Sequence, residues 1–131
     1  RECRRRVSDI ATEMGIDRVL RTTADSLPHG HQRALGIGIA LAANPELLLL
    51  DEPATGLSGE ETSAMMTRIA GLKRRGITVA LVEHDMRVIM GLCDRIVVLN
   101  FGRKIAEGTP REIQQNKDVL EAYLGTVEHV A

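Results

Sequence analysis

Two adjacent carboxylates, Asp51 and Glu52, are the residues of this sequence best suited to chemistry. They follow four consecutive leucines, 47–50, and precede Pro53. One carboxylate can hold Mg²⁺ beside substrate phosphates, and a second can take a proton from an attacking water. The alternative is an acidic turn after a core strand, which involves no chemistry. The pair therefore indicates phosphate chemistry, provided that other suitable residues join it.

Residues 27–33, which read Leu-Pro-His-Gly-His-Gln-Arg, are a second group of candidates. They precede a segment rich in small apolar residues, 34–43, which predicts a buried helix. That helix ends at Asn44, because the residue before a proline avoids the helical region. A helix N-terminus with a glycine in front of it is a ready site for an anion. The alternative is a metal bound by His29 and His31, but no third ligand is in sight beside them.

His84 is a third candidate, because it directly follows a predicted strand in the run Val-Glu-His-Asp. Taken alone, a histidine at the end of a strand most often has a structural role. Its place in the order of motifs, after the Leu-Pro-His-Gly run and the acidic pair, favours a functional role instead. A functional role for His84 therefore depends on these neighbouring motifs.

The spacing of apolar residues predicts helices and strands that alternate around these candidates. The predicted helices cover residues 1–14, 17–22, 34–43, 59–75, 85–92 and 110–125. The predicted strands cover residues 47–50, 77–82, 96–99 and 104–106. Capping boxes that begin at Ser58 and Thr109 open two of the helices. The alternation indicates an α/β fold with parallel pairing, and the turn at 100–103 predicts an antiparallel hairpin.

The packing of two predicted elements can also be judged from their residues. The strand 47–50 is apolar on both faces, which is typical of a parallel sheet covered by helices on both sides. The helix 34–43 contains Gly36 and Gly38, each of which costs about 1 kcal/mol relative to alanine within a helix. We expect close packing at both glycines to offset that cost.

The composition is that of an ordinary globular domain. The chain has 131 residues, of which 44% are hydrophobic and 27% charged. The 17 basic and 18 acidic residues give a net charge of −1, so there is no basic excess that would favour binding to nucleic acid. No apolar run approaches the length of a membrane-spanning helix. The two cysteines, Cys3 and Cys93, lie far apart and form no metal-type pair.

The order and spacing of these motifs resemble those of the ATPase subunit of an ABC transporter, and the resemblance covers nearly the whole chain. Residues 27–33 resemble the signature loop of that family, and the leucine strand with Asp51 and Glu52 resembles its Walker B strand. Residues 55–57 resemble the D-loop, and His84 resembles the switch histidine. The Leu-Pro signature and the stretch 93–108 are similar to the subgroup that serves branched-chain amino-acid importers.

The resemblance implies an α/β fold that forms the distal half of a P-loop, RecA-like ABC ATPase domain. Its sheet would be mostly parallel and flanked by helices. Residues 1–44 would be the end of the helical subdomain, with the signature loop and helix. Residues 45–131 would be the distal part of the ATPase core, with a C-terminal hairpin and helix.

The resemblance also implies a role for each candidate residue. Asp51 would help to hold Mg²⁺ through a water, and Glu52 would be the general base that activates the attacking water. His84 would contact the γ-phosphate. The signature loop would bind ATP held by the opposite subunit, through Leu27, His29, Gly30, His31 and Gln32.

The sequence departs from the family pattern at several positions. Pro28 stands where the family usually has serine, and His29 and His31 stand where glycine and glutamine are common. Ser58 stands near a D-loop position that is often aspartate. No G-x-x-x-x-G-K-[ST] loop occurs in the 131 residues. We therefore expect the chain to be the distal half of such an ATPase and to be inactive by itself.

The expected activity is hydrolysis of ATP with Mg²⁺ to energise an importer of branched-chain amino acids or similar small polar solutes. The expected partners are a second ATPase subunit and transmembrane permease subunits, at the cytoplasmic face of the cell membrane, with no nucleic acid. One alternative is a soluble ABC-type ATPase in DNA maintenance or translation. Another is a fragment that acts only as an interaction module.

The strand order of the family implies a gap in this chain. The strand that feeds the phosphate loop lies between the strands that match residues 77–82 and 96–99, and the sequence contains both neighbours without it. The two facing edges would then carry unpaired backbone groups. We expect the two strands to pair directly, a partner chain to fill the gap, or the chain to belong to a larger protein.

Overall fold

The computed structural model describes residues 2–124, and the chain divides into two compact units, Arg1–His84 and Asp85–Ala131. The first unit contains every residue predicted for the functional site. The boundary expected near residue 44 separates subdomains of the ATPase family rather than compact units, and it stays a prediction.

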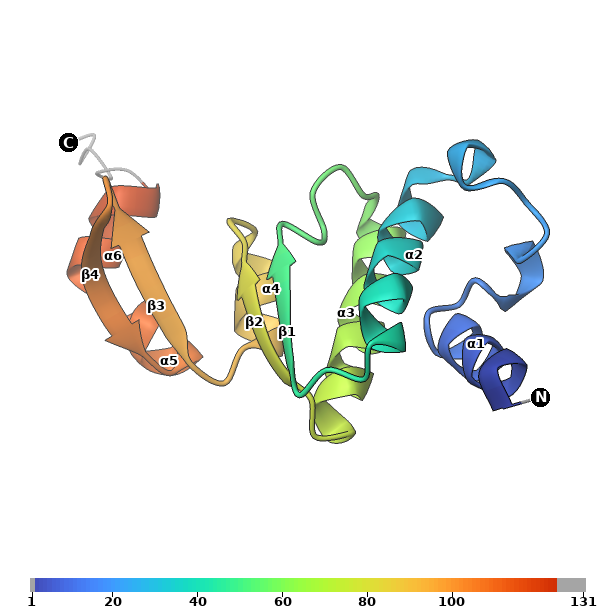
Figure 1. The fold of residues 1–131 in the computed structure, drawn as a ribbon. Helices are drawn as coiled ribbons and strands as arrows, with labels where there is room; N and C mark the ends of the chain where they lie inside the picture. Colours follow the sequence, from blue (N-terminus) through green and yellow to red (C-terminus); the bar gives the residue numbers. More distant parts are fainter. Residues whose placement is uncertain (1, 125–131) are drawn as a thin grey trace. The chain divides into compact units, whose positions relative to one another are not determined.

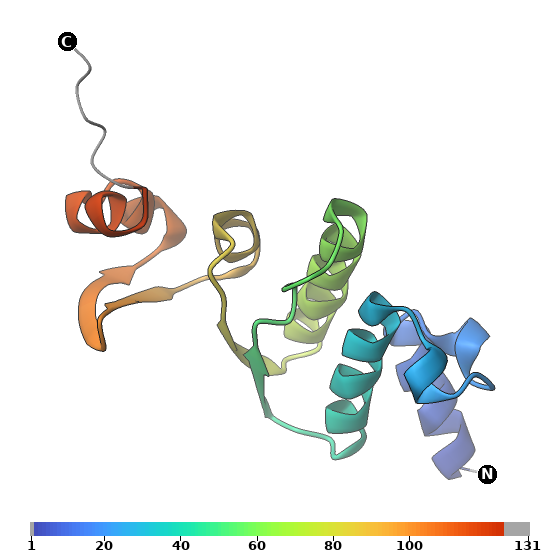
Figure 2. The same cartoon turned by 90° about the horizontal axis from the view of Figure 1, so that it is seen from above.

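The helical part of the first unit consists of three α-helices and two short 3₁₀ turns. They are α1 (Glu2–Glu13), η1 (Asp17–Val19), η2 (Ala24–Ser26), α2 (His29–Ala42) and α3 (Gly59–Arg74). Helix α2 lies between α1 and α3 in both ribbon views (Figures 1 and 2). The helix expected over residues 17–22 is only the turn η1.

The glycines of α2 differ in their surroundings. A Cβ atom on Gly38 would lie 3.4 Å from Cγ2 of Ile10 and 3.6 Å from Cγ of Met14, which is ordinary van der Waals contact, so Gly38 packs against α1 in a space that would also hold alanine. A Cβ atom on Gly36 would meet nothing within 4 Å. Packing against a neighbouring helix is therefore found at Gly38, though not so close that it requires glycine, and the expectation is wrong at Gly36.

The sheet of the first unit has two parallel strands, β1 (Leu47–Asp51) and β2 (Thr78–Val82), paired from Leu47 opposite Thr78 to Asp51 opposite Val82. Helix α3 packs against β2. Its first turn contains the predicted capping box, in which the Ser58 hydroxyl accepts a hydrogen bond from the Glu61 N–H. The sequence thus located both strands and the start of α3 to within a residue or two.

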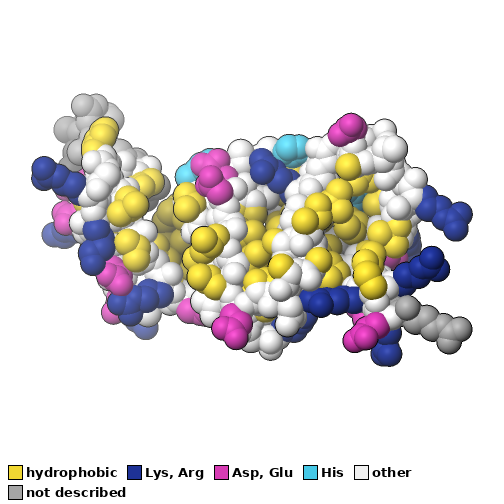
Figure 3. Space-filling model, in the orientation of Figure 1, with side chains coloured by type: hydrophobic (Ala, Val, Ile, Leu, Met, Phe, Trp, Pro, Cys, Tyr) yellow, Lys and Arg dark blue, Asp and Glu magenta, His cyan; other side chains and the backbone are white. Residues whose placement is uncertain are grey.

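Only one face of this sheet is buried. Leu48 is 4% exposed, whereas Leu47 and Leu49 on the opposite face are 53% and 72% exposed and Val82 is 63% exposed. Hydrophobic side chains gather over this part of the surface in the space-filling view (Figure 3). Cover on both sides, which is typical of such a strand, is thus not found within the first unit, where α3 packs against the sheet and the face with Leu47 and Leu49 is exposed.

The second unit contains α4 (Met86–Leu92), an antiparallel hairpin of β3 (Ile96–Asn100) and β4 (Arg103–Gly108), and two helices, α5 (Pro110–Gln114) and α6 (Lys117–Leu124). The hairpin turns at Phe101 and Gly102, whose φ angles of 47° and 74° are both positive, as a two-residue turn matched to the strand twist requires. The predicted hairpin is therefore confirmed. The core of the second unit consists of Ile96, Val98, Ile113 and Val119.

The final helix is interrupted. The Thr109 capping box opens α5 with Pro110 in its first turn, as predicted. The side-chain oxygen of Asn116 then accepts hydrogen bonds from the N–H groups of Asp118 and Val119, at 3.0 and 3.3 Å, and so starts a second helix. The prediction of one continuous helix is therefore wrong, because the asparagine side chain offers the backbone N–H groups a competing hydrogen-bond partner. The end expected at residue 125 lies outside the described residues.

The strands of the two units belong to separate two-stranded sheets. In the described part of the chain, β2 pairs only with β1, and β3 pairs only with β4. Direct pairing of the strands on either side of the expected gap, one of the three outcomes considered, is therefore not found here.

Candidate functional site

The acidic pair lies at the carboxyl end of β1. Asp51 is the last residue of the strand, and the N–H of Glu52 donates a further hydrogen bond of 2.8 Å to the carbonyl oxygen of Val82. The chain then leaves the sheet at once, because Glu52 has a φ of 46°, in the left-handed region that few residues other than glycine adopt. Such strain is common at functional sites.

The Glu52 side chain contacts His84, another of the predicted site residues, although the sequence did not predict the contact. Nδ1 of His84 lies 3.3 Å from Oε1 of Glu52, and the Thr55 hydroxyl donates a 3.1 Å hydrogen bond to Oε2. The His84 and Glu52 side chains are 66% and 45% exposed, so their attraction adds little stability. The contact matters because it brings two groups suited to proton transfer and phosphate contact to one place.

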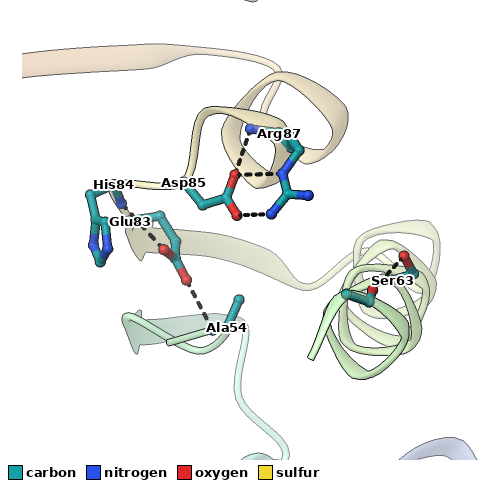
Figure 4. A network of polar contacts seen from close by, with 7 residues as sticks. Ala54, Ser63, Glu83, His84, Asp85 and Arg87 are labelled. Carbon is teal, nitrogen blue, oxygen red and sulfur yellow. Dashed lines mark hydrogen bonds and ion pairs between the residues drawn. The ribbon is translucent and has the colours of Figure 1, made fainter. Parts of the chain in front are cut away.

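Glu83 adds a link that the sequence analysis did not predict. Its Oε1 atom accepts a 2.9 Å hydrogen bond from the N–H of Ala54, and its Oε2 atom accepts a 3.2 Å bond from the N–H of His84 (Figure 4). The only signal in the sequence was an acidic residue between the end of β2 and His84. Close by in the sequence, Asp85 caps α4 and pairs with Arg87, and this contact belongs to the second unit.

The run 27–33 forms the start of α2. Leu27 is buried, Pro28 is the N-cap residue and gives no side-chain cap, and the helix begins at His29. The side-chain amide of Gln32 donates a 3.2 Å hydrogen bond to the carbonyl oxygen of Ala24, which ties the helix to the preceding turn. Nδ1 of His31 is buried and has no partner among residues 2–124.

The start of α2 packs against the start of α3. A Cβ atom on Gly30 would lie 2.7 Å from Oε1 of Glu61, so only glycine fits there without a shift of that carboxylate. Hydrogen bonds from the backbone and hydroxyl of Ser58 hold the pKa of Glu61 below its usual value, with smaller contributions from Gly30 and from the charge of His29. A Cβ atom on Gly56 would lie 3.3 Å from Nε2 of His29.

The predicted site residues thus fall into two groups. Glu52 and His84 touch each other beside Asp51, at the carboxyl end of the sheet. Residues 27–32 lie instead near Gly56, in the loop that follows β1, and near Glu61, in the first turn of α3. In the part of the chain that the structure describes, no hydrogen bond or ion pair joins the two groups.

Asp51 suits an ion that takes one carboxylate from the protein. Its carboxylate is exposed and makes no hydrogen bond or ion pair within the described residues. Those residues also contain no group of three or more His, Cys, Asp or Glu side chains that could enclose a metal. Mg²⁺ that takes its remaining ligands from phosphates and water fits this arrangement. The alternative metal site at His29 and His31 gains no third ligand there.

None of the helices between residues 2 and 124 combines the length and the apolar character that crossing a membrane requires.

Comparison with protein families gives two matches. The family described as "ABC transporter" matches residues 2–55, which include the start of α2, the whole of β1 and the acidic pair. The family described as "Branched-chain amino acid ATP-binding cassette transporter" matches residues 103–129, which include β4, α5 and α6.

Similar curated proteins include two transport ATP-binding proteins. BraF of Pseudomonas aeruginosa, a high-affinity branched-chain amino acid transport ATP-binding protein, is 42% identical over 114 residues, 86% of this chain and 45% of BraF. LivG of Escherichia coli, which has the same description, is 47% identical over 103 residues, 78% of this chain and 40% of LivG. The chain therefore spans less than half the length of these relatives.

A similar solved structure is the ADP conformation of an ATP-binding cassette of an ABC transporter. It matches with a TM-score of 0.85 and 26% sequence identity. The match covers 95% of this chain and 51% of the solved chain. The described fold is thus that of part of a P-loop ATPase domain, which confirms the predicted fold class.

Proposed function

Because the chain belongs to the ABC transporter family of ATP-binding domains, we propose that it forms the distal half of an ATP-hydrolysing subunit. The observation that carries the proposal is the contact between Glu52 and His84 beside Asp51, at the carboxyl end of a parallel sheet. Open α/β sheets bind their ligands at that edge. The proposed reaction is hydrolysis of the γ-phosphate of ATP.

Each residue of this group has one task in the proposed reaction. Glu52 accepts a proton from the attacking water and orients it toward the phosphate. His84 contacts a γ-phosphate oxygen. Because it also contacts Glu52, it keeps the general base close to the phosphate. Asp51 would hold Mg²⁺, which when bound neutralises charge on the phosphates. Positioning of this kind dominates phosphoryl transfer, since the protein forms no covalent bond.

The start of α2 has a separate task in the proposal. Its first backbone N–H groups are not capped by Pro28, and they carry the positive end of the helix dipole. We assign them, with Leu27, His29, Gly30, His31 and Gln32, to the γ-phosphate of ATP held by a second subunit. Within residues 2–124 no hydrogen bond or ion pair joins this group to Glu52, which supports that division, because the two groups would serve different nucleotides.

The proposed work is import of branched-chain amino acids or similar small polar solutes. The names of BraF and LivG and the family match at residues 103–129 support it. The proposed partners are a second ATPase subunit and permease subunits, with the chain on the cytoplasmic face of the membrane.

A chimera tests the proposal. In it, this chain replaces the matching segment of E. coli LivG, so that the relative supplies the phosphate loop. The chimera should hydrolyse ATP, and in a strain that lacks LivG it should restore uptake of leucine but not of an unrelated sugar. A folded chimera that binds ATP but hydrolyses it no faster than its Glu52→Gln variant would contradict the proposed activity. Hydrolysis without leucine uptake would contradict the proposed solute.

A further inference from the structure

The carboxylate of Glu83 connects two parts of the backbone that are far apart in sequence. One oxygen accepts from the N–H of Ala54 at 2.9 Å, and the other accepts from the N–H of His84 at 3.2 Å (Figure 4). Ala54 is buried, and Glu83 itself is half-buried. Hydrogen bonds from N–H groups to an ionised carboxylate are stronger than those between neutral groups. Both oxygens of Glu83 are therefore used to hold backbone.

One of the two donors lies close to the proposed catalytic pair in sequence, and the other belongs to it. Ala54 is the second residue after Glu52, and His84 is itself the other member of the pair. Two other contacts join the start of this loop to the end of β2 within the described residues, the Glu52 N–H to the Val82 carbonyl oxygen and the Glu52 carboxylate to His84, and both involve Glu52 itself. The N–H groups of Thr55 and Leu57 donate to Glu52 and Ala54, and so stay within the loop. Glu83 thus holds the part of the loop beyond Glu52 to the end of β2.

We propose that Glu83 is a positioning residue, which holds the loop after β1 against the end of β2 and thereby keeps Glu52 and His84 in contact. This inference rests on the proposed ATPase function. Glu83 touches neither nucleotide nor water in the proposed reaction, so its removal should impair the chemical step more than the binding of ATP. It needs two acceptor oxygens, which distinguishes it from a residue that merely carries charge.

Two substitutions separate these requirements. Glu83→Gln keeps one acceptor for Ala54 but places an NH₂ group, which cannot accept, opposite the N–H of His84. Glu83→Leu removes both acceptors at a similar size. Glu46→Gln is the matched control, because Glu46 is an exposed acid beside β1 whose side chain has no hydrogen bond within residues 2–124.

The first measurement needs no nucleotide. Amide hydrogen exchange in the 131-residue chain should show the Ala54 N–H exchanging about tenfold faster in Glu83→Leu, by loss of its acceptor. The Glu52 N–H, which donates to Val82, is the internal reference and should change much less. An unchanged Ala54 rate in a folded Glu83→Leu chain would overturn the proposal.

The second measurement uses the LivG chimera. Glu83→Leu should lower kcat about tenfold, with KM for ATP within about twofold, because a misplaced catalytic group affects the transition state and not ground-state binding. The kcat of Glu83→Gln should lie between that of Glu83→Leu and that of the unsubstituted chimera. If the Ala54 amide responds but kcat stays at the level of Glu46→Gln, the positioning role is wrong. If the unsubstituted chimera hydrolyses no ATP, the proposed function itself fails, and Ala54 exchange still decides whether the Glu83 bridge exists.

Discussion

Nδ1 of His84 lies 3.3 Å from Oε1 of Glu52, although the two residues follow different strands. The contact is a consequence of strand direction and register. β1 and β2 run parallel with Asp51 opposite Val82, so the residues that follow each strand emerge at the same edge of the sheet. The sharp turn at Glu52 then keeps its side chain near that edge. The register of the sheet thus brings the two side chains together without a bound nucleotide.

Replacing Glu52 by glutamine should separate hydrolysis from binding. In the LivG chimera, Glu52→Gln should keep ATP binding but slow hydrolysis about a hundredfold, the scale of losing a general base. Glutamine retains an oxygen for the Thr55 hydroxyl but cannot take the proton. Steady-state ATPase and nucleotide-binding assays measure the two effects. Hydrolysis within about threefold of the unsubstituted chimera would remove Glu52 from the proposed mechanism. Glu60→Gln, an exposed acid at the start of α3, is the control.

The 131-residue chain alone should not bind nucleotide. It contains no phosphate loop, which cradles the phosphates of the nucleotide in this class of ATPase, and Asp51 offers only one carboxylate for the ion. Calorimetry with millimolar Mg-ATP should therefore show no binding heat. A micromolar dissociation constant would mean that the described residues form a more complete nucleotide site than we propose.

The sequence predicted much of the fold because several of its signals are local. The leucine strand, the two capping boxes and the turn at Phe101 and Gly102 each specify their structure within a few residues. The break at Asn116 is local as well, but an asparagine within a helical pattern is equally compatible with an exposed helix position. Its role as the start of α6 depends on the packing of Val119 into the core.

The Glu83 bridge and the exposed face of β1 could not be predicted in the same way. The bond from Ala54 to Glu83 joins residues that are distant in sequence and leaves no periodic pattern. Four leucines indicate a strand that can be buried on both faces, but the exposure of Leu49 depends on which other elements are present. Both features are set by tertiary contacts that composition and spacing do not encode.

The charge cluster at Glu107 predicts an acid-sensitive hairpin. Hydrogen bonds from Lys104 and Arg95, at 2.8 and 2.6 Å, lower the pKa of Glu107 from its usual 4.5 to about 2. A depressed carboxyl pKa stabilises the fold fully above about pH 4.5, and the stabilisation is lost as pH falls toward 2. Urea denaturation of the second unit, followed by NMR, should show this loss between those values. Glu107→Gln should flatten that part of the profile, and an unchanged profile would exclude the cluster as its cause.

The capping box at the start of α3 should contribute measurably to stability. Ser58→Ala removes the oxygen that accepts from the Glu61 N–H and should lower the free energy of unfolding by about 1 kcal/mol. Ser63→Ala is the matched control, because its hydroxyl only donates to the Gly59 carbonyl oxygen within the same helix (Figure 4). Alanine favours a helix interior, so the control should be neutral or slightly stabilising. Equal losses in both variants, measured by urea denaturation, would contradict a specific role for the cap.

The open face of the β1–β2 sheet should make the isolated chain self-associate. Leu47, Leu49 and Val82 are all more than half exposed there, and an exposed sheet with unpaired edges is a template for pairing with another copy. Exposed apolar surface drives association at micromolar to millimolar concentrations. Light scattering at about 100 μM should therefore show species larger than a monomer. Leu49→Lys should shift the population toward monomer, because a charge resists burial in the contact. Thr67→Lys adds the same charge at an exposed position of α3 and should leave association unchanged. A monomeric parent chain, or equal effects of the two lysines, would show that this face does not drive association.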